Sequence, residues 1–230
     1  MKKIFVANWK ANKTVDEALA WLGEAKSGLE SSNTQVVICP GFTALKSLSE
    51  QLQGSEIKLG AQDVSPYPSG AYTGEVSAEI LKGLVTHCIV GHSERKKYFA
   101  ETESAVAEKV KQLLGFEITP ILCVANLDQL NNYMNSYSYI KTQGEKIIFV
   151  YEPPSAISGG GDYHPESPDE ASKIVEQFKS GIGRNCPVLY GGSVNPEVID
   201  SFLKKENIDG FLVGKASLTP SDFLALVSCA

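Results

Sequence analysis

The chain has 230 residues, of which 43% are hydrophobic, and a formal net charge of −6. This length suits one large domain or two small ones, and it allows a sizeable core. The acidic balance argues against a nucleic-acid partner, and no apolar stretch is long enough to cross a bilayer. An anionic ligand would therefore have to be bound by local cations and backbone dipoles, because the overall field repels it.

The N-terminal segment MKKIFVANWK is basic and then apolar, but it turns polar again at Asn8. It is too short for a signal peptide and predicts a first strand. The five cysteines are odd in number and form no CxxC pair. We interpret them as reduced structural thiols of a cytoplasmic protein; they are Cys39, Cys88, Cys123, Cys186 and Cys229.

Eight short apolar runs rich in Val, Ile and Leu predict parallel strands that are buried on both faces. In chain order they are IFVAN (4–8), QVVIC (35–39), IKLGAQ (57–62), HCIVG (87–91), TPILCV (119–124), KIIFVYE (146–152), PVLYG (187–191) and DGFLVG (209–214).

Helical patterns with recognisable starts lie between most of these runs. A capping box begins at Thr14, and cap-then-proline signals occur at Ser167, Asn195 and Thr219. Strands that alternate with helices indicate a parallel sheet, and eight such units match a closed (β/α)₈ barrel, here one domain over residues 1–230. An open doubly wound sheet is the competitor, but it would favour a GxGxxG turn where this chain has Asn8-Trp9-Lys10.

In such a barrel, functional residues gather where the strands end. Each polar residue at these positions also has a plain structural interpretation: a solvated lysine, a hydrogen-bonded histidine, a paired carboxylate or a glycine turn. Together they place a carboxylate, an imidazole, an ammonium group and two glycine-rich loops at one mouth. They are Asn8 and Lys10, then His92, Ser93, Glu94 and Arg95, then Glu152, the YGGS segment 190–193, and Gly214 with Lys215.

Seven segments in this order resemble the triosephosphate isomerase family: NWKAN, GAQDVS, GAYTGEVS, IVGHSERK, YEP, YGGSV and DGFLVGKASL. The match runs from Ile4 to about Leu218. The resemblance implies a single barrel that interconverts dihydroxyacetone phosphate and D-glyceraldehyde 3-phosphate through an enediolate, with neither a cofactor nor a metal ion.

The resemblance also implies the roles of the reacting groups. Glu152 would be the catalytic base, and the proline after it disfavours helical geometry and keeps it extended at the strand end. A neutral His92 would polarise the carbonyl, Lys10 would stabilise negative charge, and Glu94 would pair with Lys10. Asn8 would be a neighbouring polar contact, with Ser93 in support.

The phosphate group would be held by glycine-rich backbone rather than by a basic surface. The residues that match the family's phosphate site are Gly191, Gly192, Ser193, Gly214, Ser158 and Lys215. Between a stiff Pro153-Pro154 hinge and a permissive 159–161 hinge, residues 155–157 would form the tip of a closing lid. The long loop 65–77 resembles the family's dimer loop, which would place Thr73 in the site of a partner subunit.

Several residues differ from the family pattern. Ser155 replaces a tryptophan of the lid, Ser158 replaces a glycine, and Lys215 replaces the second glycine of the eighth loop, where it could add charge or crowd the phosphate. Lys96 replaces an arginine, and CVAN replaces CIGE before a shortened fifth unit. The altered lid leaves one alternative, a sugar-phosphate-binding barrel with weak or no turnover. A lyase or synthase barrel would be expected to lack GHSER followed by YEP.

Overall fold

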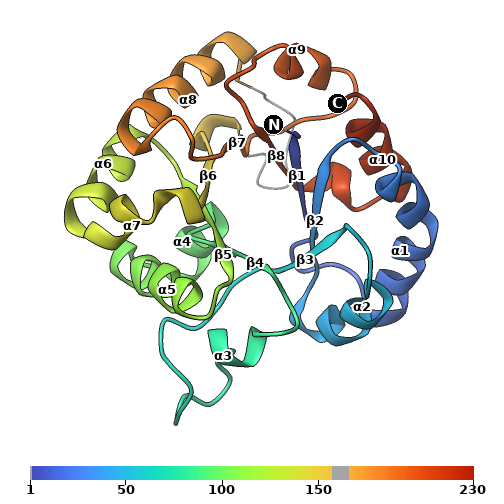
Figure 1. Cartoon of the computed structure of the whole chain (residues 1–230), viewed down its shortest axis with the longest axis horizontal. Helices are drawn as coiled ribbons and strands as arrows, with labels where there is room; N and C mark the ends of the chain where they lie inside the picture. Colours follow the sequence, from blue (N-terminus) through green and yellow to red (C-terminus); the bar gives the residue numbers. More distant parts are fainter. Residues whose placement is uncertain (1, 157–165) are drawn as a thin grey trace.

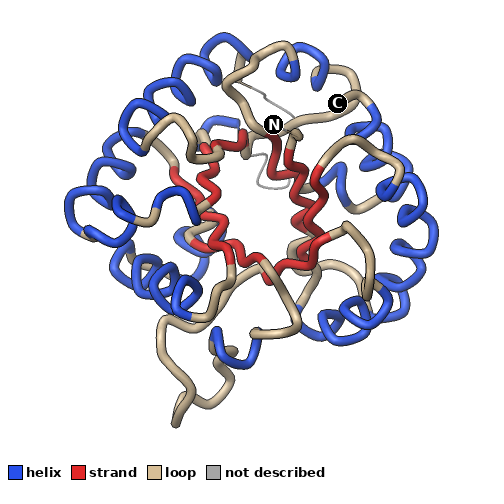
Figure 2. The backbone as a smooth tube through the Cα atoms, in the orientation of Figure 1, coloured by secondary structure: helices blue, strands red, loops and turns tan. Residues whose placement is uncertain are grey.

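The computed structural model of the chain describes residues 2–156 and 166–230. Eight parallel strands pair in sequential order and close into a barrel, which confirms the predicted fold over an open sheet (Figures 1 and 2). The strands are β1 (Ile4–Asn8), β2 (Gln35–Cys39), β3 (Lys58–Ala61), β4 (His87–Val90), β5 (Thr119–Val124), β6 (Ile148–Tyr151), β7 (Val188–Tyr190) and β8 (Gly210–Val213).

Helices form an outer ring around the strands, as Figure 2 shows. The α-helices are α1 (Val15–Glu30), α2 (Leu45–Gln51), α3 (Ala78–Leu81), α4 (Ser93–Phe99), α5 (Glu103–Gly115), α6 (Leu127–Ser136), α7 (Ser138–Thr142), α8 (Pro168–Ile182), α9 (Ile199–Leu203) and α10 (Pro220–Ser228). Short 3₁₀ turns are η1 (Phe42–Ala44), η2 (Gly144–Lys146), η3 (Pro154–Ala156) and η4 (Lys215–Ser217). No helix in the described ranges is both long and apolar enough to span a membrane.

Local capping explains where most helices begin. The Thr14 hydroxyl accepts from the Glu17 N–H at 3.3 Å, and the Glu17 carboxylate accepts from the Thr14 N–H at 2.7 Å, as the capping box predicts. The Asn195 signal marks a turn instead: its side chain accepts from the N–H groups of Glu197 and Val198, and regular helix begins only at Ile199.

The core has two layers, one inside the barrel and one between the strands and the helices. Alternate strand residues fill the barrel interior, so it is packed and is not a pore. They are Ile4, Val6, Val37, Cys39, Ile89, Ile121, Cys123, Ile148, Val150, Leu189 and Leu212. Because these described residues fill the interior, a ligand on the barrel axis would have to bind at one of its ends.

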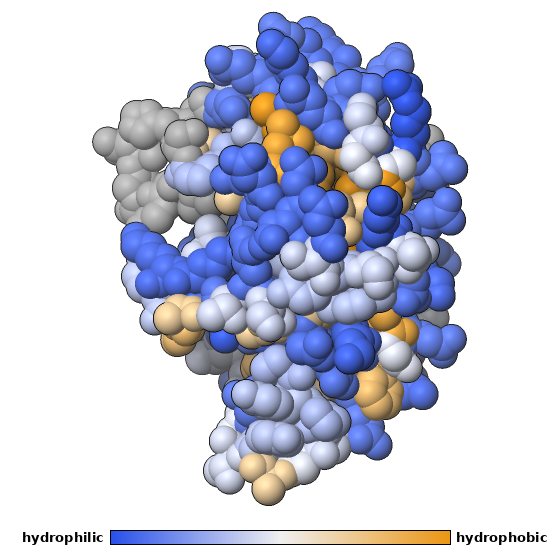
Figure 3. Space-filling model, turned by 90° about the vertical axis from the view of Figure 1, so that its left-hand side faces the viewer, coloured by the Kyte–Doolittle hydropathy of each residue, from blue (hydrophilic) through white to orange (hydrophobic). Residues whose placement is uncertain are grey.

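The connection from β3 to β4 protrudes from the barrel beside α3 (Figure 1). The rings of Tyr67 and Tyr72 stack there at 4.5 Å, and both are exposed, by 49% and 41%. Figure 3 shows this lower end of the molecule in mostly pale colours, which mark residues of intermediate hydropathy. The protrusion therefore presents aromatic surface away from the rest of the chain.

Candidate active site

Glu152 lies at the carboxyl end of β6, where its N–H donates to the Val124 carbonyl at 2.9 Å. Its side chain is buried, and the whole residue is only 3% exposed. One carboxylate oxygen accepts from the Ser93 N–H at 3.0 Å, and the other lies 3.1 Å from Nε2 of His92. The carboxylate is thus held at the mouth by two groups from the start of α4.

His92 is the N-cap residue of α4, and its ring accepts at Nδ1 from the Glu94 N–H at 3.2 Å. An imidazolium has no acceptor nitrogen, so this hydrogen bond assigns a neutral ring with its proton on Nε2. The proton on Nε2 then points at Glu152. The Ser93 hydroxyl is buried beside His92 without a hydrogen-bond partner among the described residues.

Lys10 follows β1 with a positive φ of 54°, which is rare for a residue with a side chain. Its N–H donates to the Asn8 side chain at 3.1 Å, and Nε2 of Gln62 donates to its carbonyl at 2.8 Å. These contacts direct the ammonium group to Glu94, where the two charges pair at 2.5 Å. The strained backbone is therefore fixed by hydrogen bonds from two strand ends.

Two glycine-rich turns approach these groups. A Cβ atom on Gly191 would lie 2.8 Å from Cγ of Glu152, and one on Gly192 would lie 2.2 Å from the Tyr190 hydroxyl. A Cβ atom on Gly214 would lie 3.7 Å from the Lys10 ammonium nitrogen. The N–H groups of Gly192 and Gly214 donate to no residue in the described ranges, so both are available to a ligand.

Ser193 is engaged differently. Its N–H and its hydroxyl both donate to the Ala156 carbonyl, at 3.1 and 2.9 Å. Ala156 ends η3, the turn that follows Glu152. In this structure Ser193 therefore connects the loop after β7 to the segment after β6.

A cavity of about 740 Å³ joins these groups. Its lining includes most of the residues that the sequence predicted for the site: Asn8, Lys10, His92, Glu152, Gly191, Gly192, Ser193, Gly214 and Lys215. The wall is extended by Asn195 from the loop before α9, by Thr219, the N-cap residue of α10, and by Asp222 of α10.

Several predicted residues are not among those that line this cavity. Glu94 and Ser93 contact its lining residues rather than the cavity itself. Thr73 lies exposed on the protrusion. Ser158 and the rest of 157–165, which include the trailing hinge of the expected lid, lie outside the described residues.

Sequence reasoning missed Gln62, which ends the third predicted strand run. Its amide donates to the carbonyls of Lys10 and Cys39, at 2.8 and 2.9 Å. The same rule that selected polar residues after the other strands would have selected Gln62. Sequence reasoning also missed Asn195 and Asp222, because neither residue directly follows a strand.

The fold and the mouth together define the class of protein. A closed parallel barrel presents a carboxylate, a neutral imidazole and a paired lysine beside free backbone N–H groups. Such a set of groups is suited to acid–base chemistry on a small substrate.

Comparison with known proteins specifies the family. The family model described as "Triosephosphate isomerase" matches residues 3–230. The chain is 38% identical over 248 residues to the triosephosphate isomerase of Alkaliphilus metalliredigens, covering 99% of each chain. It is 38% identical to the enzyme of Clostridium beijerinckii over 245 residues, again 99% of each, and to that of Thermus thermophilus over 249 residues, 100% of each. The chain belongs to the triosephosphate isomerase family.

Proposed function

We propose that this chain interconverts dihydroxyacetone phosphate and D-glyceraldehyde 3-phosphate by proton transfer through an enediolate. Membership of the family across the full chain supports the reaction. The observation that carries the chemistry is the contact between Glu152 and the neutral ring of His92, 3.1 Å apart on the wall of one cavity. A base and an uncharged hydrogen-bond donor are what this reaction requires.

Glu152 would act as the base. Its carboxylate would take the proton from the carbon next to the carbonyl and return it to the neighbouring carbon. The substrate would have to enter between Glu152 and His92, so that Nε2–H of the ring donates to the substrate oxygen instead of the carboxylate. The negative charge of the enediolate would then be stabilised by the hydrogen bond from Nε2–H of His92.

Lys10 would stabilise the negative charge of the substrate and the enediolate. Its pairing with Glu94 at 2.5 Å holds the ammonium group in one place without removing its donors from the cavity. Asn8 lines the same cavity and accepts from the Lys10 N–H, so its role would be to fix the lysine backbone beside the substrate.

The phosphate group would be held by the N–H groups of Gly192 and Gly214, with Lys215 beside them. Ser193 would join only after it leaves the Ala156 carbonyl that it contacts now. Gly191 would serve by its small size, because it lies against Glu152. Ser158 remains a sequence-based member of this set.

The chain would work as a homodimer in the cytoplasm. Several large hydrophobic side chains are exposed on the protrusion and on neighbouring α3 and α4: Tyr67, Tyr72, Ile80, Tyr98 and Phe99. The stacked rings of Tyr67 and Tyr72 form exposed aromatic surface that a partner subunit would cover. The five cysteines are all free thiols and four are buried, as suits a reducing compartment.

Turnover in D₂O tests the reaction. The purified chain is incubated with dihydroxyacetone phosphate in D₂O, and the glyceraldehyde 3-phosphate formed is analysed by NMR. Because a carboxyl proton exchanges with solvent, we expect deuterium at the carbon that receives the transferred proton. Product without deuterium from the wild type, together with unchanged turnover by Glu152→Gln, would contradict proton transfer through Glu152. Binding without turnover would favour the alternative of a sugar-phosphate-binding barrel.

A further inference from the structure

The charges around the cavity are unevenly paired. Within residues 2–156 and 166–230, two lysines and two carboxylates line it: Lys10, Lys215, Glu152 and Asp222. A fifth charge, Glu94, contacts Lys10 at 2.5 Å. Without Lys215, the paired Lys10 and Glu94 would cancel, and the two lining carboxylates would leave the described wall with net negative charge. A doubly charged phosphate would then approach a mouth of its own sign on a chain of net charge −6.

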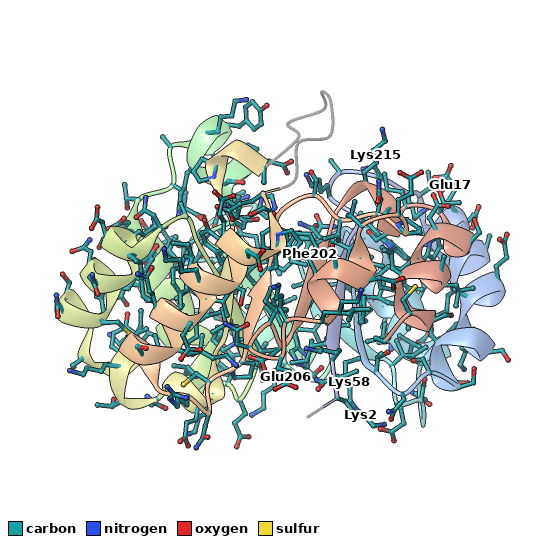
Figure 4. The ribbon with its side chains drawn as sticks, turned by 90° about the horizontal axis from the view of Figure 1, so that it is seen from above. Lys2, Glu17, Lys58, Phe202, Glu206 and Lys215 are labelled. Carbon is teal, nitrogen blue, oxygen red and sulfur yellow. The ribbon has the colours of Figure 1, made fainter. Side chains whose placement is uncertain are left out.

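Lys215 is the cation that changes this balance. It is exposed, and it forms no ion pair with any residue in the described ranges. Figure 4 places it at the end of the barrel opposite Lys2 and Lys58. Its neighbour Gly214 lies against Lys10, since a Cβ atom there would be 3.7 Å from the Lys10 nitrogen. Both lysines line the same cavity, Lys10 with its ammonium group paired to Glu94 and Lys215 without an ion pair among the described residues.

The two lysines differ in what they can do for a ligand. Lys10 is fixed by Glu94 and by its own strained backbone, so its charge acts at a set point inside the cavity. Lys215 is solvated, and a solvated charge acts mainly on the approach and retention of an ion, with an effect that salt screens. Because its side chain is exposed and directed to solvent, it adds charge at the rim rather than crowding the phosphate.

We propose that Lys215 is a specificity-determining residue that attracts and retains the dianionic phosphate group of the substrate. The proposal rests on the proposed function and deepens it. The proposal concerns the side chain of Lys215 and not its backbone, because the backbone at this position is the same for other residue types. The expected signature is a loss in kcat/KM that is larger than the loss in kcat and that disappears as ionic strength rises.

The test compares Lys215→Met with Lys2→Met, which makes the same change of charge at the opposite end of the barrel. Steady-state kinetics on glyceraldehyde 3-phosphate and calorimetric binding of inorganic phosphate are measured at ~10 mM and ~300 mM salt. At low salt we expect Lys215→Met to lose ~3- to 10-fold in kcat/KM and in phosphate affinity, and to approach wild type at high salt. Lys215→Arg should restore most of the loss.

Three results would overturn the proposal. Lys215→Met could lose no more than Lys2→Met, its loss could persist unchanged at high salt, or Lys215→Gly could bind phosphate more tightly than wild type, which would mean that the side chain crowds the anion. Failure of the proposed function would be visible separately, as a wild-type chain that binds phosphate without isomerising the triose.

Discussion

Gly191 touches the side chain of Glu152 so closely that a methyl group on the glycine would lie 2.8 Å from Cγ of the glutamate. The same methyl group would lie 2.6 Å from Cγ1 of Val150. The first residue of the loop after β7 thus sets the space available to the carboxylate at the end of β6. This loop belongs to the expected phosphate site. The contact between Gly191 and Glu152 therefore links the phosphate site to the expected catalytic base.

The change Gly191→Ala tests this contact. The added methyl group must push Glu152 away, because Val150 is fixed in the barrel interior. A base misplaced by about 1 Å can cost ~10²-fold, so we expect kcat to fall by ~10- to 100-fold while KM changes less. Gly181→Ala, on α8 with nearest neighbour Leu130 at 3.9 Å, is the control and should behave like wild type. Equal kcat values in both variants would show that Gly191 does not position the base.

Gln62 is expected to hold Lys10 in its strained conformation. Gln62→Met removes the donor from two carbonyls, those of Lys10 and Cys39. We expect a loss of ~1–2 kcal/mol in the free energy of unfolding, measured by urea denaturation, and a rise in KM as the ammonium group shifts. Gln51→Met, on the exposed side of α2, should change neither quantity. An unchanged KM for Gln62→Met would mean that Glu94 alone fixes the lysine.

His87 gives the fold a defined response to acid. Burial, with a smaller contribution from Lys58, lowers its pKa to about 4. In the unfolded chain the ring takes up a proton below about pH 6.5, whereas the folded chain resists until about pH 4, so the unfolded state binds more protons between these values. Stability should therefore fall as pH drops through this window, by at most about 3 kcal/mol.

The variant His87→Gln checks this dependence. Urea denaturation of wild type and variant is compared from pH 7 to pH 4. The variant lacks the titrating ring, so its stability should decline less steeply over this range, whatever its stability at pH 7. Parallel declines in the two proteins would assign the acid sensitivity to other groups.

The exposed Tyr67–Tyr72 stack is expected to lie in a homodimer interface. Tyr72→Asp would place a charge in that contact, so light scattering should give a dimer for wild type and a monomer for the variant at the same concentration. If Thr73 reaches the partner's site, the monomer should also lose activity. A wild-type chain that is a fully active monomer would contradict the assignment of residues 65–77.

The barrel and the ends of its strands could be predicted from sequence because both follow from local patterns. Apolar runs fixed the eight strands to within a residue or two, and each strand end then placed Asn8, His92 or Glu152 at the mouth. The proline after Glu152 and the cap at His92 are local signals as well.

Contacts between distant segments could not be predicted in this way. Gln62 reaches Lys10 across the barrel mouth, and the Tyr151 hydroxyl donates to Glu166 at 3.2 Å, although neither pair has any local signature. The Asn195-Pro196 signal was read as a helix start because capping side chains also stabilise isolated turns. Here the side chain of Asn195 stabilises a turn, and the helix begins farther along the chain, at Ile199.

The most direct test of the whole account is the coupled isomerase assay on Glu152→Gln. Glutamine keeps the size of the side chain but cannot accept the substrate proton. We predict a fall in kcat of ~10²- to 10⁴-fold, with inorganic phosphate bound about as tightly as in wild type. Glu24→Gln, an exposed position on α1, should retain full activity. Normal turnover by Glu152→Gln would contradict the central claim that this carboxylate moves the proton.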